Sequence, residues 1–179
     1  VIRASVGNAV AGGVESGSST LSMQLVKQIF VQQALQEPTE EKRQAAYDKA
    51  TATSFDRKLK EMKLAIGLEK KYTKKEILTA YLNIAFFGDN TYGIQAAAQR
   101  YFSVDAKDLT LPQAASLVAI VQYPELRGLD DPENYERNTG RRDVVLNAML
   151  DAGSITAEEH AEAIATVVDD AFLLPSEPN

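Results

Sequence analysis

The sequence predicts a mainly α-helical domain, and three observations support this prediction. Apolar residues recur at intervals of three and four in several segments, which places them on one face of a helix. Three segments open with a Thr that is followed three residues later by Glu or Gln, the pattern of a helix capping box. No segment of useful length alternates apolar and polar residues as a half-buried strand does. With 45% hydrophobic residues, the 179-residue chain can bury one sizeable core.

The N-terminal part of the chain is expected to change from loop to helix near residue 18. Residues 1 to 17 are rich in glycine and other small residues, which is typical of a loop. The helix that follows has Ser18 or Ser19 as its expected N-cap. Its apolar positions are Leu21, Met23, Leu25, Val26, Ile29 and Phe30.

Residues 36 to 52 are polar and charged, with one proline. The sequence leaves open whether they form a surface helix or lack regular structure. We expect residues 1 to 17 and 36 to 52 to be the least ordered parts of the chain, because the first segment is expected to lack an upstream packing partner and the second lacks a clean apolar face.

Further helices are expected from residue 55 to the C-terminal region. The first of them has one apolar face, formed by Phe55, Leu59, Met62 and Ile66. The next begins at the capping box of Thr73 and ends near Gly88, and its apolar face consists of Ile77, Leu78, Tyr81 and Leu82. The other two boxes begin helices at Thr110 and Thr156, and Gly153 is the expected stop of a helix over residues 140 to 151.

The composition excludes several kinds of function. Without cysteine, the chain holds neither a disulfide nor a Cys-ligated metal ion. Its one histidine, His160, cannot form a His cluster and is expected to be exposed on a late charged helix. The formal net charge of −6 argues against nucleic-acid binding, which needs a basic surface. No run of about 18 apolar residues is present that could span a membrane.

One segment departs from this acidic average. Between Arg57 and Lys75, eight Lys or Arg residues and two Glu give a net charge of +6, which leaves −12 for the rest of the chain. Within it, Arg57 and Lys58 precede Glu61 by four and three residues and so share a helix face with it. Taken alone, this is either a solvated ion-pair face or an anion site. The hydroxyl-rich run from Gly17 to Lys27 is likewise either a simple helix cap or an anion site at a helix N-terminus.

Taken in order, these motifs resemble glycosyltransferase family 51, the peptidoglycan glycosyltransferase domain of class A penicillin-binding proteins. Gly17 to Lys27 is similar to the second family signature, and Arg57-Lys58-x-x-Glu61 is similar to the third. Lys74 to Asn83 resembles the fourth signature, and Arg141-Arg142-x-x-Val145-Leu146 resembles the fifth. Shorter similarities lie between them at Phe87-Gly88, Tyr92-Gly93-Ile94 and Tyr101-Phe102. Four signatures in the family's order, over residues 17 to 146, carry the resemblance.

The chain also departs from the family pattern. Met23 and Gln28 stand where many members have Gln and Asn, and Thr79 replaces a frequent Glu. The first signature, an Asp/Glu pair followed by Phe and His, is absent from the 179 residues. Because members place it shortly before an Arg-Ala pair like Arg3-Ala4, we expect residues 1 to 179 to be a single glycosyltransferase domain that is truncated at its N-terminus.

The resemblance implies a fold and a reaction. The fold is lysozyme-like and helical, with a smaller jaw lobe near the membrane, which we expect over residues 28 to 55. The reaction is the polymerisation of lipid II, which forms β-1,4 bonds with inversion and releases undecaprenyl pyrophosphate. The general base belongs to the missing signature, so these residues alone are expected to be inactive. Glu61 is the second catalytic carboxylate of the family, and it orients Arg57 and Lys58 or a bound metal ion.

The same resemblance implies substrate-binding roles for Ser19, Thr20, Gln24, Lys27, Arg57, Lys58 and Asn83, and structural roles for Arg141 and Arg142. It implies no firm cofactor, and it leaves open whether a Mg or Mn ion binds at the lipid pyrophosphate. The implied partners are lipid II, the growing glycan strand, the membrane surface and a C-terminal transpeptidase domain, with no nucleic acid. The implied location is the outer face of the bacterial cytoplasmic membrane, with an anchoring transmembrane helix upstream.

Two other functions remain as alternatives. A lysozyme-like hydrolase shares the helical core, but it needs an acid that protonates a glycosidic oxygen and does not need the cation cluster. A non-catalytic helical domain would only bind a lipid-linked precursor or a partner protein. The penicillin-reactive centre is not in these residues, since they contain neither Ser-x-x-Lys nor Lys-Thr-Gly.

Overall fold

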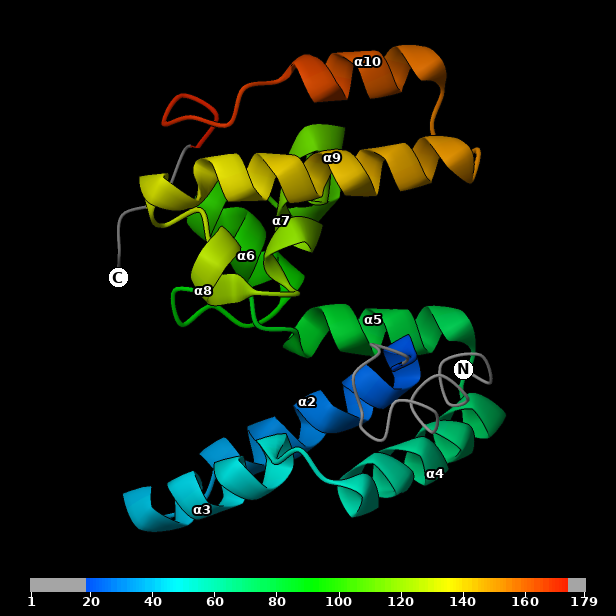
Figure 1. Ribbon diagram of the computed structural model, residues 1–179, viewed down its shortest axis with the longest axis vertical. Coiled ribbons are helices and arrows are strands. Elements are labelled where there is room, and N and C mark those ends of the chain that lie inside the picture. The colour runs from blue at the N-terminus through cyan, green and yellow to red at the C-terminus, as the bar shows by residue number, and fades with distance from the viewer. Residues whose placement is uncertain (1–18, 174–179) are drawn as a thin grey trace. The chain divides into compact units, whose positions relative to one another are not determined.

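The computed structural model describes residues 19 to 173, and these residues are mainly helical, as predicted (Figure 1). The helices are α2 (Leu21–Leu35), α3 (Glu40–Thr51), α4 (Phe55–Lys71), α5 (Lys74–Ile84), α6 (Ile94–Phe102), α7 (Leu111–Ile120), α8 (Pro124–Arg127), α9 (Tyr135–Asp151) and α10 (Ala157–Ala165). Within the described range no strand forms, and one isolated bridge joins Phe86 to Tyr92. The chain divides between Ile84 and Ala85 into two compact units, which are described in turn.

Helix α2 is the centre of the first unit, where it packs against α3, α4 and α5. Met23 and Val26 of α2 form a buried cluster with Ala65 of α4. The N-cap of α2 is Thr20, whose Oγ1 accepts a hydrogen bond from the Met23 backbone N–H at 3.3 Å. The prediction of Ser18 or Ser19 as the N-cap was therefore wrong, because Thr20 is the hydroxyl residue placed three positions before a free N–H group of the first turn.

Residues 36 to 52 turn out to contain a regular helix, α3. Thr39 caps it by accepting a hydrogen bond from the Lys42 N–H, and Glu40 and Glu41 place negative charge in its first turn. Ala50 is buried in this unit, where α3 packs against α2. The open question about this segment is thus decided in favour of a helix, whereas the expectation for residues 1 to 17 lies outside the described residues.

Helix α4 buries a different face from the one that its apolar residues predicted. Glu61 and Ala65 are its buried residues, and Met62 is half-buried beside them. Phe55, Leu59 and Ile66 are 68%, 48% and 51% exposed. Ala65 packs against Met23 and Val26 of α2, and the larger apolar residues of α4 face outward. Leu78 of α5 was also predicted in the core and is exposed, while Ile77 and Tyr81 of the same helix are buried.

The second unit opens with a tight turn at the motifs Phe87-Gly88 and Tyr92-Gly93. Gly88 and Gly93 have φ angles of +81° and +87°, a region that favours glycine. The rings of Phe86 and Tyr92 contact each other across the turn, with centroids 4.9 Å apart and an angle of 38° between their planes. Helix α5 ends at Ile84, so the predicted end near Gly88 was four residues too late, because the turn begins directly after Ile84.

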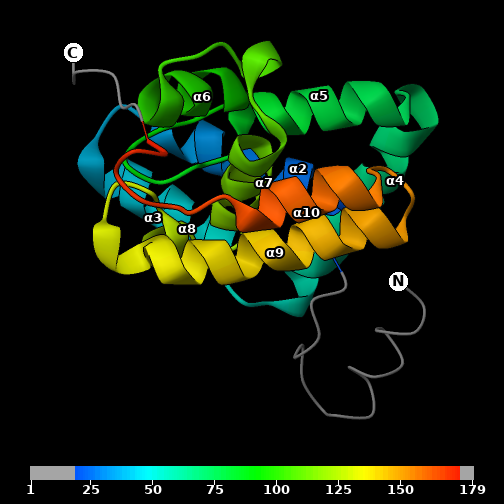
Figure 2. The ribbon, with the colours of Figure 1, turned by 90° about the horizontal axis from the view of Figure 1, so that it is seen from above.

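Helices α7, α9 and α10 form the core of the second unit through Ala115, Leu146 and Ala163. Helices α9 and α10 lie side by side in both ribbon views (Figures 1 and 2). The capping boxes at Thr110 and Thr156 are present as predicted. Helix α9 begins at Tyr135, five residues before the predicted start. His160 is half-buried rather than exposed, because its Nε2 lies 2.8 Å from Asn147 Oδ1 on α9.

Arg142 is buried in this core, and its guanidinium bonds the C-terminal end of α10. It donates to the backbone oxygens of Thr166 at 2.7 Å and Ile164 at 3.3 Å, and it is paired with Asp143 at 2.8 Å. Carbonyl groups at a helix C-terminus lack partners within the helix and attract cations. The predicted structural role of Arg142 is confirmed.

We predict that Arg142→Ala destabilises this unit by about 3 kcal/mol, because it leaves two carbonyl groups and a cavity in the core. Arg137→Ala on the same helix is the control, since Arg137 is exposed and donates to the Asn134 side chain. It should cost less than about 1 kcal/mol. Urea unfolding followed by circular dichroism measures both, and equal losses would contradict the assigned role.

Candidate functional site

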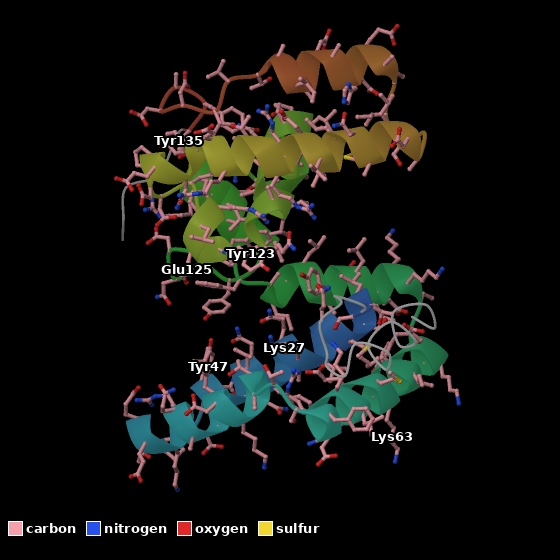
Figure 3. The ribbon with its side chains drawn as sticks, viewed as in Figure 1. Lys27, Tyr47, Lys63, Tyr123, Glu125 and Tyr135 are labelled. Carbon is pink, nitrogen blue, oxygen red and sulfur yellow. The ribbon has the colours of Figure 1, made fainter. Side chains whose placement is uncertain are left out.

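The predicted site residues all lie in the first unit. Helix α2 and the two residues before it provide Ser19, Thr20, Gln24 and Lys27, and α4 provides Arg57, Lys58 and Glu61. Because α2 packs directly against α4, residues from the second and third signatures are brought together. Figure 3 shows Lys27 on α2, and it shows Lys63 on the side of α4 that faces away from α2.

Glu61 carries a carboxylate that is 2% exposed, and it lies one turn of α4 before Ala65, which packs against Met23 and Val26 of α2. Arg57 lies one turn earlier and donates from Nη1 to Glu61 Oε1. Its Nε also donates to the Ala52 carbonyl oxygen. Bonded at two points, the guanidinium is held in one orientation beside the buried carboxylate. The ion pair expected from the spacing is therefore present, but on the buried face of the helix.

Lys58 joins the two signatures across 39 residues of sequence. Its Nζ donates a hydrogen bond to Ser19 Oγ, just before the start of α2. Both Lys58 and Arg57 are half-buried. The Lys58 ammonium thus reaches the residue that precedes α2, where unpaired backbone N–H groups add positive potential.

Thr20, Gln24 and Lys27 share one face of α2 because they are spaced by four and three residues. The Gln24 side-chain oxygen accepts a hydrogen bond from the Tyr81 hydroxyl of α5, at 3.2 Å. Sequence reasoning treated Tyr81 only as part of an apolar face and missed this contact. Two features could have indicated this contact: Tyr81 belongs to the fourth signature, and its side chain, expected in the core, ends in a polar hydroxyl group.

Asn83 is the predicted site residue that the structure connects least to the others. It is exposed on α5, and it lies two residues after Tyr81, which places it on nearly the opposite side of that helix. Its assignment as a substrate contact stays a prediction.

A pocket of about 490 Å³ lies beside the site residues in the same unit. Its lining residues are Thr20, Leu21, Ser22, Glu69, Tyr72, Lys74, Ile77 and Leu78. Of the predicted site residues, Thr20 is among them, whereas Glu61, Gln24 and Lys27 are not. Ser22 and Glu69 are hydrogen-bonded in it at 2.6 Å.

A resident metal ion does not fit the residues around Glu61. Its carboxylate is paired with Arg57, and the neighbouring Lys58 adds a second positive charge. Within residues 19 to 173 no three His, Cys, Asp or Glu residues are grouped as metal ligands.

Comparisons with known proteins show the family to which this chain belongs. The model of the family described as Transglycosylase matches residues 1–150. Penicillin-binding protein 1A of Streptococcus oralis is 36% identical over 95% of this chain and 24% of its own length. Penicillin-binding protein 1F of Bacillus subtilis is 39% identical over 89% and 20%. The chain therefore spans about a fifth to a quarter of the length of these relatives.

Among solved structures, the crystal structure of penicillin-binding protein 1A from Haemophilus influenzae resembles this chain with a TM-score of 0.51 and 33% sequence identity. The similarity covers 60% of this chain and 15% of that one. The mainly α-helical fold is shared with that protein.

We predict that Arg57→Ala lowers the free energy of unfolding by about 2 to 3 kcal/mol, because it leaves the Glu61 carboxylate buried without its partner. Arg43→Ala is the matched control in the same unit. It breaks a pair of the same residue types with Glu40, in which the two side chains are 36% and 81% exposed, and it should cost about 0 to 1 kcal/mol. Urea titration of both variants tests this, and a loss at Arg57 no larger than at Arg43 would show that the pair acts as a surface pair.

Proposed function

Because the chain belongs to the transglycosylase family, and so is a peptidoglycan glycosyltransferase domain, we propose that it lengthens glycan chains from lipid II. In the proposed reaction, the 4-hydroxyl of an acceptor lipid II attacks the anomeric carbon of the growing strand. A β-1,4 bond forms, the bond from that carbon to undecaprenyl pyrophosphate breaks, and a carboxylate of the first signature takes the hydroxyl proton. These 179 residues hold no match to that signature, so by themselves they are expected to make no product.

The observation that supports this proposal is the cation cluster fixed around Glu61. Pyrophosphate gains negative charge as it leaves, and cations held in place beforehand stabilise that charge most. Arg57 is oriented by Glu61 and Ala52, and Lys58 is bonded to Ser19. We assign both to the leaving pyrophosphate, together with Lys27. Glu61 acts by holding Arg57 in place.

The hydroxyl groups at the start of α2 suit the same ligand. Thr20 Oγ1 accepts a hydrogen bond from the Met23 N–H, and Ser19 Oγ accepts one from Lys58. A hydroxyl that accepts in this way still has its own hydrogen to donate. Phosphate oxygens only accept, so both hydroxyls are prepared as donors toward pyrophosphate or sugar.

The hydrolase alternative fits these contacts less well. A glycosidase acid must be protonated near neutral pH, which needs a carboxyl group kept away from positive charge. Glu61 Oε1 instead accepts a hydrogen bond from the Arg57 guanidinium. The arrangement around Glu61 therefore supports the transferase.

The relatives suggest the setting of this domain. They are named penicillin-binding proteins and are about four to five times as long as the matched segment. We propose that the full protein also carries a transpeptidase domain, and that it works at the outer face of the cytoplasmic membrane. A helix suited to crossing a bilayer is not found within residues 19 to 173.

We expect the contact with the membrane surface to involve the exposed apolar stripe of α4, defined as Phe55, Leu59 and Ile66. Lys63 and Lys70 lie beside the stripe on the same helix and are exposed as well. An apolar stripe bordered by lysines is the pattern of a helix that lies on an anionic bilayer. The jaw lobe over residues 28 to 55 stays a prediction. The stripe begins at the last residue of that segment, so the proposed membrane contact lies mostly just after the jaw lobe in the sequence.

The transferase proposal predicts that Glu61→Gln keeps the fold but lowers lipid II turnover by a hundredfold or more, about 3 kcal/mol in the barrier. Arg57→Ala and Lys58→Ala should also weaken binding of a phosphoglycolipid inhibitor, because each removes a charge-assisted contact. Turnover of labelled lipid II and the thermal midpoint are measured on a chain that also carries the first signature. Near-normal turnover in all three variants would mean that the cluster is only a structural ion pair.

The membrane proposal predicts that replacing Phe55, Leu59 and Ile66 together by Ser weakens binding to phosphatidylglycerol-containing vesicles by more than about tenfold, because apolar area no longer leaves water. Leu64→Ser is the matched control, since Leu64 is 41% exposed and lies nine residues after Phe55, on the opposite side of α4. Vesicle sedimentation measures binding. Equal losses in the two variants would argue against a membrane role for the stripe.

A further inference from the structure

Tyr81 is a buried residue of α5 whose polar end reaches an exposed residue of α2. Its side chain is 8% exposed, and its hydroxyl donates to Gln24 Oε1 at 3.2 Å across 57 residues of sequence. Gln24 itself is exposed, on the face of α2 that also carries Thr20 and Lys27. The contact therefore links the packing of α5 against α2 to a side chain of the proposed substrate face.

The hydroxyl of Tyr81 keeps its proton around neutral pH and can therefore donate a hydrogen bond. Burial raises the pKa of this phenol above its ordinary value, so the proton stays in place. With its one side-chain oxygen engaged by Tyr81, the Gln24 carboxamide must turn its NH₂ group the other way. That group has two hydrogens to donate, and pyrophosphate and sugar oxygens accept them.

An exposed glutamine without such a partner samples several rotamers, and binding a ligand then requires that freedom to be lost. Ile77 of the same helix is buried one turn earlier and provides apolar packing there. A phenylalanine at position 81 would fill the same space, so the hydroxyl is the part of Tyr81 that packing does not explain.

We propose that Tyr81 is a positioning residue, which holds the Gln24 carboxamide so that its NH₂ group points toward the oxygens of the lipid pyrophosphate or its sugar. This inference rests on the proposed function, because it takes Gln24 as a substrate contact. It connects the fourth signature to the second through one hydrogen bond, and Tyr81 itself does not touch the substrate.

The test compares Tyr81→Phe, Gln24→Ala and the double variant for binding of labelled undecaprenyl pyrophosphate to the 179-residue chain. Tyr81→Phe should weaken binding by about threefold to tenfold, the effect of one neutral hydrogen bond. Gln24→Ala should weaken it at least as much, and the double variant should be no weaker than Gln24→Ala. Normal binding by Tyr81→Phe beside weak binding by Gln24→Ala overturns the inference and leaves the proposed function intact. Normal binding by Gln24→Ala overturns both the inference and the assignment of Gln24.

A second measurement separates positioning from general stability. In Tyr81→Phe, the side-chain NH₂ signals of Gln24 in a nitrogen-15 correlation spectrum should move toward the values of a mobile glutamine. The control is Tyr101→Phe in the second unit, where the hydroxyl of a tyrosine that is 2% exposed donates to the Phe87 carbonyl oxygen at 2.9 Å.

Tyr101→Phe should lower the thermal midpoint but leave the Gln24 signals and ligand binding unchanged. If Tyr101→Phe weakens binding as much as Tyr81→Phe, or if the Gln24 signals do not move in Tyr81→Phe, the positioning role is overturned.

Discussion

The buried carboxylate of Glu61 is the constraint on which the arrangement of the first unit depends. A charge at this depth is stable only with a partner, and Arg57 is that partner from one turn earlier on the same helix. Arg57 is in turn bonded to the carbonyl of Ala52, in the link between α3 and α4. The rotation of α4 about its axis is set by these contacts. The same rotation brings Lys58 to the start of α2 and turns the apolar stripe of Phe55, Leu59 and Ile66 outward.

Local rules predicted much of the fold. The capping boxes at Thr73, Thr110 and Thr156 depend on residues three positions apart, and each is present with its reciprocal hydrogen bonds. The family, the helical class and the Arg57–Glu61 pair were also predictable, the last from its spacing of four. What could not be predicted was which face of α4 is buried. Periodicity selects the most apolar face, whereas here the face against α2 is the one that holds Glu61.

The candidate site was predictable as a set of residues but not as a set of contacts. Ser19 and Lys58 are 39 residues apart, and Gln24 and Tyr81 are 57 apart, so neither hydrogen bond follows from a local pattern. Each depends on how α4 and α5 pack against α2. Tyr81 shows the general difficulty: its ring belongs to the core and its hydroxyl to the site, and a hydropathy pattern records only the ring.

The buried Arg142 bears on where the second folding unit ends. The family model matches residues 1–150, yet two of the oxygens that accept hydrogen bonds from this guanidinium belong to Ile164 and Thr166. Phe172 lies farther along the chain, and its ring packs edge-on against Phe102 at 5.3 Å. A segment that ended at residue 150 would keep the pairing of Arg142 with Asp143 and lose its two backbone acceptors and the Phe172 ring. The core of the second unit is therefore completed by residues that lie beyond the segment by which its relatives are recognised.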